Sequence, residues 1–534
     1  MAAMEDSEAP CLLIGGQAAL VGFSDFRGRP VDHDTSGGWR SALFVVAVEI
    51  CSSFAFYGVP SNLITYLTGP LGHSNAAAVN AWSATGHMMP LLGAFIADSW
   101  LGRYRSIVLA CTLYVMGYGM ITLASTLLVH GPSSPLQVAF FYASLYLIAI
   151  AQGAEKPCGL AFAADQFDPD NPKERASRSS LFNWWYFSMA VGISVAIAVV
   201  SYVQENVGCG IGFGVLCAIM LCASAVFLVG TPTYRMYAPT PGTRRRHFAL
   251  LARSLIALAK SSVLGGKTHH RQEEEEEDDE DAAVKSEDTR GVLRLLPIWA
   301  ACLAYGLVFA QVTTLFNKQG RTLDRRIFGG LELPPAALQT FGPVSILVFV
   351  PVYDRALVPV LRWATGNPSG LTPLQRIGTG MAVSLVAVSV AALVEGRRLE
   401  TAREHGLVDD TGAAVPMSWV WLVPQYAMVG LADVFAVVGM QEFFYDQMPS
   451  ELRSLGLALC LSVLGIGGFI SSALISLIDG VTGNNGGDSW FADNLNRAHL
   501  DYFYWLLAGV SAAELALYFC LASSYVYNNH KSLK

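Results

Sequence analysis

Glu49 is a carboxylate inside an apolar stretch, VVAVEICSSFAFYGVP, at residues 45–60. A charge at the centre of a membrane-spanning helix costs about 2.5–3.5 kcal/mol, so such a residue usually pairs with an opposite charge or faces water. Glu49, Ser52, Ser53 and Phe56 follow i, i+3, i+4, i+7 spacing and share one helical face. We expect that face to look into a cavity rather than at lipid.

A cation for this carboxylate is found in the stretch AQGAEKPCGLAF, residues 151–162. Glu155 and Lys156 are adjacent there, about 100° apart around a helix axis. We predict that Glu49 and Lys156 form a buried ion pair that protonation or substrate can break. The alternative is a fixed pair that only holds two helices together.

Acidic and aromatic residues elsewhere complete the candidate site. Glu442 lies near the end of an apolar stretch at 417–445, and we predict a functional role for it because intramembrane charges are usually functional. Asp433 of the same stretch could instead bond to a neighbouring backbone group. Ligand sites favour aromatic walls, although most membrane aromatics pack or anchor. The candidate pocket residues are Tyr57, Trp185, Phe309, Gln311 and Tyr445.

Long apolar segments must position all of these residues. The chain has 534 residues, of which 53% are hydrophobic and only 14% charged, too little charge to cover a soluble protein of this size. A span needs about 20 residues to cross about 30 Å of hydrocarbon. Twelve segments qualify, near 40–67, 79–98, 105–129, 136–160, 180–203, 211–230, 294–316, 336–353, 374–394, 417–445, 453–478 and 501–527. We predict an all-α membrane protein with twelve transmembrane helices.

A long polar segment divides the spans into two groups of six. The predicted organisation is an N-terminal tail (1–38), a six-helix half (39–230), a linker (231–291), a second six-helix half (292–527) and a C-terminal tail (528–534). The linker holds a candidate interfacial helix at 248–263 and an acidic run at 273–281, which we expect to be a solvated loop. Halves of this kind occur in carriers that rock around a site at the bilayer midplane.

Loop charges predict the orientation. In the first half, the loops 68–78, 130–135 and 204–210 carry no Lys or Arg, whereas the opposite loops carry five. Positive loops stay in the cytosol, so both termini and the linker should be cytosolic. The second half does not support this by itself, because its outer loops also carry basic residues.

Several function classes are disfavoured. The stretch LGGKT at 264–268 ends like a phosphate-binding loop, but Ser261 replaces its first glycine and no strand precedes it. No hydrolase constellation and no zinc-like Cys/His spacing stands out. We expect no enzyme, cofactor, metal or nucleic-acid partner. The expected partners are a small-molecule solute, protons and the lipid bilayer. The glycines of GIGGF, residues 465–469, indicate close helix packing.

Six stretches resemble the plant nitrate transporter 1/peptide transporter family, a proton-dependent oligopeptide transporter branch of the major facilitator superfamily. They are FAFYGVPSNLITYLTGPLG (54–72), LLGAFIADSWLGRYRSI (91–107), KPCGLAFAADQFD (156–168), FNWWYFSMAVG (182–192), LQRIGTGM (374–381) and QEFFYDQMPSELRSLG (441–456). The resemblance implies the major facilitator fold, alternating access and proton-coupled uptake. It also implies a gating role for the loop residues Asp98, Arg103 and Arg105.

The first-span motif departs from the family pattern. The resemblance implies E-x-x-E-R/K with a partner lysine on the fourth span, and this chain reads EICSS at 49–53. Glu49, Lys156 and Glu442 match family positions, whereas Ser52 and Ser53 replace an acid and a base. A carboxylate beside an opposite charge tends to stay ionised, so proton loading of Glu49 becomes harder. We predict weak or absent proton coupling, with Glu155 as a candidate substitute carboxylate.

Two further positions bear on substrate and regulation. Phe309, in VFAQ, stands where dual-affinity nitrate carriers of the family place a histidine, and a phenyl ring cannot donate a hydrogen bond to an anion. This favours an organic metabolite or hormone. Ser106 stands where the same carriers have a regulatory phosphorylated threonine, and a plain loop hydroxyl is the alternative.

The functional hypotheses are three. The first is a secondary active or facilitative transporter of a small solute (nitrate, peptide, hormone or specialised metabolite) with weakened coupling. The second is a fully proton-coupled symporter of nitrate or peptides, and the third is a solute sensor without net transport. The stretch EAPCLL, residues 8–13, fits an acidic dileucine sorting pattern, which leaves the vacuolar membrane and the plasma membrane as alternatives.

Overall fold

The computed structural model describes most of the two predicted halves. The described residues are 13–14, 17–18, 23–31, 36–59, 86, 88–127, 135–168, 171–237, 294–327, 332–366, 370–410, 413–483, 489–492 and 494–525. The candidate interfacial helix at 248–263, the acidic run at 273–281, residues 8–12 of the sorting pattern and the tail 528–534 lie outside them.

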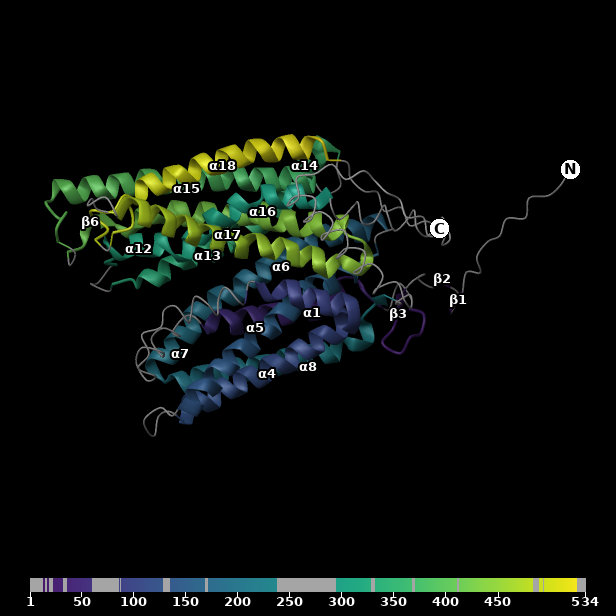
Figure 1. The fold of residues 1–534 in the computed structure, drawn as a ribbon. Coiled ribbons are helices and arrows are strands. Elements are labelled where there is room, and N and C mark those ends of the chain that lie inside the picture. The colour runs from purple at the N-terminus through teal and green to yellow at the C-terminus, as the bar shows by residue number, and fades with distance from the viewer. Residues whose placement is uncertain are drawn as a thin grey trace, which may run out of the picture.

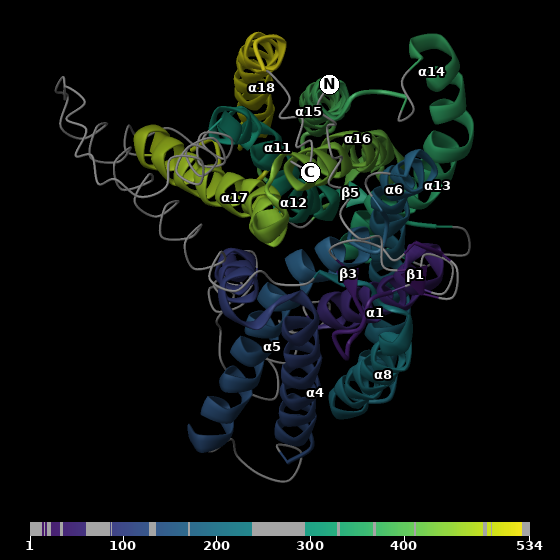
Figure 2. The same cartoon turned by 90° about the vertical axis from the view of Figure 1, so that its right-hand side faces the viewer.

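Two helical bundles pack side by side, as Figures 1 and 2 show. The first contains α1 (Gly38–Gly58), α4 (Arg103–Leu127), α5 (Pro135–Ala164), α6 (Pro172–Val195), α7 (Ser201–Asn206) and α8 (Cys209–Gly230), with the short helical segments η1 (Ala97–Leu101), η3 (Ala196–Val200) and η4 (Thr231–Thr233). The second contains α11 (Leu303–Thr313), α12 (Leu315–Arg321), α13 (Phe341–Val352), α14 (Val358–Thr365), α15 (Pro373–Glu404), α16 (Val423–Gln447), α17 (Arg453–Gly483) and α18 (Leu500–Ser523), with η5 (Pro335–Thr340), η6 (Tyr353–Leu357), η7 (Trp419–Leu422) and η8 (Ser450–Leu452).

The helices have the length and composition of membrane spans. Among the described residues, 11 helices are long and apolar enough to cross a bilayer. The remaining predicted span, near 79–98, falls partly on residues outside the description, and its described end is the apolar helix Met88–Leu101. The all-α membrane architecture predicted from the sequence is therefore confirmed.

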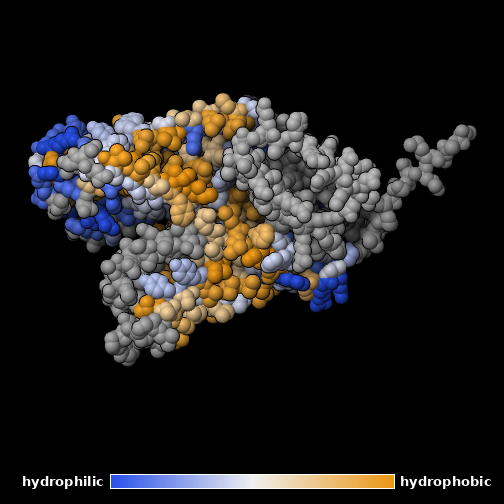
Figure 3. Space-filling view, viewed as in Figure 1, coloured by the Kyte–Doolittle hydropathy of each residue, from blue (hydrophilic) through white to orange (hydrophobic). Residues whose placement is uncertain are grey.

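Apolar side chains also cover the outer surface. On α4, Leu109, Met116 and Leu123 are spaced by seven residues and face outward, whereas Tyr114 and Tyr118 are buried. Figure 3 shows a hydrophobic band that crosses both bundles, with hydrophilic residues gathered toward the ends. Such a band is what a lipid-facing surface requires, because hydrocarbon cannot solvate polar groups.

Local signals in the sequence begin two of the long helices. Asn171 caps α6 by accepting a hydrogen bond from the Lys173 backbone N–H at 3.0 Å, with Pro172 in the first turn. Thr372 and Gln375 form a reciprocal capping box at the start of α15. Both helices carry inter-bundle contacts in their first turns or soon after, so these caps help to position the site.

Glycines allow close contact between α11 and α17. A Cβ atom on Gly467 would lie 2.4 Å from the Gly306 carbonyl carbon, and one on Gly306 would lie 2.3 Å from the Val463 carbonyl oxygen. No side chain fits at either position without a shift of backbone. The close packing predicted for the GIGGF stretch therefore holds at Gly467, whereas a Cβ on Gly468 would meet nothing within 4 Å.

Short strands pair with one another outside the helices. They are β1 (Leu13–Ile14), β2 (Gln17–Ala18), β3 (Phe23–Ser24), β4 (Met236–Tyr237), β5 (Leu323–Asp324) and β6 (Val415–Ser418). β3 pairs antiparallel with β4, with Phe23 opposite Tyr237, and this pairing joins the N-terminal tail to the segment that follows α8. This strand pair lies at the end of the molecule where α1 begins and α8 ends, which is called the terminal end below (Figure 1).

Candidate functional site

The Glu49 carboxylate and the Lys156 ammonium meet between α1 and α5. Glu49 Oε1 lies 2.6 Å from Lys156 Nζ, and the Glu49 side chain is fully buried. The Ser53 hydroxyl donates to the same carboxylate oxygen at 2.8 Å and accepts from Lys156 Nζ at 2.8 Å. Ser52 donates back to the Glu49 carbonyl at 3.2 Å. Ser53, which stands where the family pattern has a basic residue, therefore bridges Glu49 and Lys156 through its hydroxyl.

Glu155 adds a second buried carboxylate to this pair. Its Oε2 lies 3.9 Å from Lys156 Nζ, and its side chain is 1% exposed. Neither Glu155 Oε2 nor Glu49 Oε2 has a hydrogen-bond partner among the described residues. A Cβ on Gly159 would lie 3.4 Å from Glu155 Oε1 and 3.2 Å from the Trp185 ring, so Trp185 of α6 closes the site on that side. Two carboxylates thus share one ammonium.

Asp354 of η6 joins the second bundle to α6 of the first. Its two carboxylate oxygens accept hydrogen bonds from three side chains, Ser180 Oγ at 3.0 and 2.9 Å, Asn183 Nδ2 at 2.8 Å and Trp184 Nε1 at 3.0 Å. All three donors lie within α6, on consecutive turns. A carboxylate that accepts from several donors is a strong and specific contact between the bundles.

Arg376 of α15 extends this contact to the candidate residue Glu442. Arg376 donates to Asn183 Oδ1 at 2.6 Å and to the Val434 carbonyl at 2.7 Å. Its guanidinium lies 3.7 Å from Glu442 Oε2 and 4.3 Å from the centroid of the Tyr353 ring. Arg376 is 2% exposed, so Glu442 supplies part of the charge that its burial requires.

Asp433 is a third buried carboxylate between the bundles. It accepts a hydrogen bond from the Tyr305 hydroxyl of α11, and Tyr186 of α6 also hydrogen-bonds to it. Asp433 acts electrostatically on Tyr57 of α1, as Lys156 does. Tyr57, which the sequence predicted as a pocket residue, is therefore within electrostatic range of both the Glu49–Lys156 pair and the α16 carboxylate.

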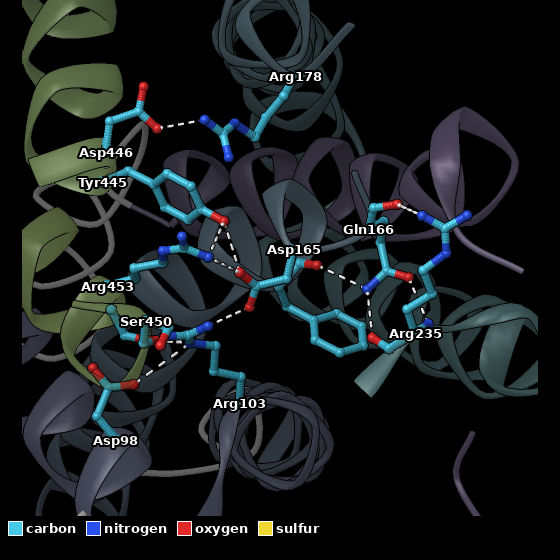
Figure 4. A network of polar contacts seen from close by, with 12 residues as sticks. Asp98, Arg103, Asp165, Gln166, Arg178, Arg235, Tyr445, Asp446, Ser450 and Arg453 are labelled. Atoms are coloured by element: carbon cyan, nitrogen blue, oxygen red, sulfur yellow. Dashed lines mark hydrogen bonds and ion pairs between the residues drawn. The ribbon is translucent and has the colours of Figure 1, made fainter. Parts of the chain in front are cut away.

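A polar network joins the two bundles near the start of α1, at the terminal end, as Figure 4 shows. Asp165, which follows α5, accepts from the Tyr445 hydroxyl at 2.7 Å and from Arg453 at 3.1 Å, and it also pairs with Arg103. The Arg453 guanidinium lies 4.6 Å from the centroid of the Tyr445 ring. Asp165 and Arg103 belong to the first bundle, and Tyr445 and Arg453 to the second.

The same network caps α17 from the opposite bundle. Asp98 Oδ2 accepts from the Leu455 backbone N–H at 3.0 Å, in the first turn of α17, where a negative charge is favourable. Arg103 lies 3.6 Å from Asp98 and donates to Ser454 Oγ at 3.0 Å and to the Ser450 carbonyl. Arg178 pairs with Asp446 at 2.8 Å nearby (Figure 4). Asp98 and Arg103, predicted as gating residues, are thus both in contact with the second bundle.

Other predicted residues lie apart from these contacts. Gln311 is fully buried and donates to Ser471 at 2.9 Å within the second bundle. Phe309 is partly buried against the apolar core of that bundle. Arg105 is exposed at the start of α4. Ser106 is in the first turn of α4 rather than in a loop, and its hydroxyl is buried without a partner among the described residues.

Tyr445, predicted as a pocket residue, lies where the two bundles meet, and its hydroxyl belongs to the network around Asp165. The sequence reasoning also missed Asp165, Asp354 and Arg376 as partners between the bundles. Arg376 lies inside a predicted span, and the rule that intramembrane charges are functional could have identified it.

Comparisons with known proteins agree in pointing to transporters. The PTR2 family model, described as POT family, matches residues 104–491. The chain is 49% identical over 540 residues to "Protein NRT1/ PTR FAMILY 5.10" of Arabidopsis thaliana, covering 96% of this chain and 97% of that protein. It is 47% identical to "Protein NRT1/ PTR FAMILY 5.16" of the same organism, with 96% and 98% covered.

Solved structures share the fold at lower identity. An auto-inhibited POT family peptide transporter superposes with a TM-score of 0.62 at 21% identity, covering 92% of this chain and 98% of the other. A POT family transporter in complex with 5-aminolevulinic acid superposes with a TM-score of 0.60 at 15% identity, covering 91% and 98%. Both similarities concern the arrangement of the helices.

Proposed function

The chain belongs to the NRT1/PTR family within the POT transporters, and from that premise we propose that it carries a small organic solute by alternating access, with proton coupling through Glu49 weakened. Membership makes the chain a membrane transporter of small solutes and not an enzyme. The nature of the solute and the coupling are the proposed part.

The bridged ion pair carries the proposal for weak coupling. Glu49 Oε1 receives the Lys156 ammonium at 2.6 Å and the Ser53 hydroxyl at 2.8 Å. Charge-assisted hydrogen bonds of this kind stabilise the ionised carboxylate. The favourable charge of the Lys156 ammonium, 2.6 Å from Oε1, is lost when Glu49 becomes neutral, so we expect coupling through Glu49 to be weak while this pair is intact.

The contacts between the bundles support alternating access. The network around Asp165 joins the bundles at the terminal end, and Asp354 joins η6 of the second bundle to α6 of the first. This arrangement supports a state closed at the terminal end, in which the network must break before the solute leaves on that side.

The character of the central residues supports an organic solute. Lys156 and Arg376 are the cations there, and Arg376 is engaged by Asn183 and Val434. Phe309 offers no hydrogen bond to a small anion such as nitrate. The buried Asp433 beside two tyrosine hydroxyls further disfavours a small anion. We propose cytosolic termini from the loop charges of the first half, and a vacuolar or plasma membrane location from the sorting pattern.

Counterflow in proteoliposomes tests this proposal. A screen of solute uptake in oocytes that express the chain first identifies a substrate. Oocytes that express Lys156→Ala are the control. Reconstituted protein should exchange labelled for unlabelled solute without a pH gradient, and an imposed gradient should add little accumulation. If a pH gradient drives strong accumulation of solute and Glu49→Gln abolishes it, the chain is a full proton symporter and the proposal of weak coupling is wrong. Solute binding without counterflow would indicate the sensor.

A further inference from the structure

The charges of the three ionisable side chains between α1 and α5 do not sum to zero. When all are ionised, Glu49 and Glu155 carry two negative charges and Lys156 one positive charge. Among the described residues, Lys156 is the basic side chain within 4.0 Å of either carboxylate, at 2.6 Å from Glu49 and 3.9 Å from Glu155. An isolated charge in a buried site is costly, and binding one more cation removes it.

The hydrogen bonds decide which carboxylate takes that cation. Glu49 Oε1 is contacted by Lys156 and by the Ser53 hydroxyl. The Oε2 atoms of both glutamates are buried without a hydrogen-bond partner among the described residues. Glu155, however, receives no hydrogen bond from the ammonium, which lies 3.9 Å from its Oε2, and hydrogen-bonds instead to the neutral Ser52 hydroxyl. Ionised Glu155 is therefore the less stabilised of the two. We propose that Glu155 binds one exchangeable proton and is the group through which pH acts on transport.

The proposal rests on the proposed carrier function and adds to it a proton site on α5. Burial favours a proton over a solute ammonium, because Glu155 is 1% exposed while the adjacent Lys156 side chain is 11% exposed. Water that reaches Lys156 can deliver the proton to Glu155 Oε2, which becomes a neutral carboxylic acid. The acid returns the proton to the water from which it came, so the site sets the rate of exchange without coupling it to a pH gradient.

Groups from three helices act on Glu155. They are Lys156 and Cys158 on its own helix α5, Glu49 and the hydrogen-bonding Ser52 on α1, and Cys111, Tyr114 and Tyr118 on α4. The Tyr114 and Tyr118 hydroxyls are buried without a partner among the described residues. Trp185 of α6 contributes an apolar wall. This side of Glu155 therefore offers no cation among the described residues to replace the proton.

Protonation of Glu155 should change the rate of solute exchange in one direction. Ionised Glu155 leaves a net negative charge that must lose water when the bundles close over the solute. Protonated Glu155 leaves only the neutral Glu49–Lys156 pair, so closure becomes easier. Lower pH should therefore speed exchange, and Glu155→Gln should mimic the protonated state.

Counterflow at equal pH on both sides tests this sign. Between about pH 8 and about pH 5.5, the wild-type rate should rise by at least roughly fivefold, which is the effect of one unit charge at about 4 Å even when bulk water screens it. Glu155→Gln should be fast and independent of pH, and Glu155→Asp should keep the response. Glu514→Gln, which removes a carboxylate on α18, is the matched control and should behave like the wild type. An unchanged pH response in Glu155→Gln overturns the proposal.

Infrared difference spectra give a readout that needs no transport. The wild type taken from high to low pH should gain the C=O band of a protonated carboxylic acid, and Glu155→Gln should lack that band. If the band persists in Glu155→Gln, the proton binds elsewhere and the inference is wrong. If no variant shows counterflow yet the band behaves as expected, the carrier proposal fails while the proton site stands. A rate that follows sodium rather than pH would overturn the inference in favour of a metal cation.

Discussion

The Ser53 hydroxyl of α1 accepts a 2.8 Å hydrogen bond from the Lys156 ammonium of α5. In the family pattern this position is basic, and a second cation there would compete with Lys156 for Glu49. With serine at this position, Lys156 lies 2.6 Å from Glu49, and we expect this pair to be tighter than one that shares Glu49 with a second cation.

Restoring the charged motif should restore coupling. Ser52→Glu with Ser53→Arg adds one titratable carboxylate and one cation while the net charge stays the same. We expect a larger gradient-driven accumulation than in the wild type, because the new carboxylate has no lysine locked to it. Reconstituted uptake with and without a pH gradient measures this, and Ser52→Ala with Ser53→Ala is the control. Equal accumulation in a folded double variant would count against the role given to EICSS.

Removing one member of the buried pair should cost more than removing both. Lys156→Ala leaves Glu49 and Glu155 without a cation, and breaking such a pair typically costs about 3–5 kcal/mol. Lys156→Met with Glu49→Gln removes charge on both sides and should be closer to the wild type. Thermal unfolding in detergent compares them. Lys156→Ala melting at the wild-type temperature would show that water already solvates the pair.

The Tyr445 hydroxyl should stabilise the state closed at the terminal end. Tyr445→Phe keeps the ring that lies 4.6 Å from Arg453 but removes the bond to Asp165 at 2.7 Å. Hydrogen bonds to charged groups contribute about 1.5–3 kcal/mol, so the closed population should fall by roughly tenfold or more. Accessibility of cysteine labels placed at that end reports the change.

Tyr518→Phe is the matched control for this experiment. Its hydroxyl is equally buried but bonds to the Leu374 carbonyl at 2.7 Å within the second bundle. It should lower stability without changing label accessibility at the terminal end. Equal effects of the two variants would mean that Tyr445 contributes to folding rather than to gating.

Adjacent glycines on α17 should respond differently to a methyl group. Gly467→Ala would place a Cβ 2.4 Å from the Gly306 carbonyl carbon, whereas Gly468→Ala meets nothing within 4 Å. Overpacking typically costs about 1–3 kcal/mol, so Gly467→Ala should lower the melting temperature. Gly468→Ala should leave it unchanged or raise it, because alanine favours helix. A reversed order would contradict the packing of α11 on α17.

The sequence by itself determined the membrane class, because spans are long continuous apolar segments that need no partner to be recognised. It also identified Glu49 and Lys156 as candidates, since a charge within such a segment is conspicuous whatever surrounds it. The second predicted span was recognisable in the same way, although only its end, Met88–Leu101, is described.

Only the tertiary structure decided which polar groups meet across the bundles. Asp165 and Arg453 are 288 positions apart, and no periodicity within one helix can indicate such a pairing. The same holds for Tyr445, whose sequence context suits a pocket wall but whose hydroxyl reaches Asp165 on the other bundle. Helix periodicity fixes the face on which a side chain lies. The packing of one bundle on the other fixes what that face touches, and the balance of charge at Glu155 follows from that packing.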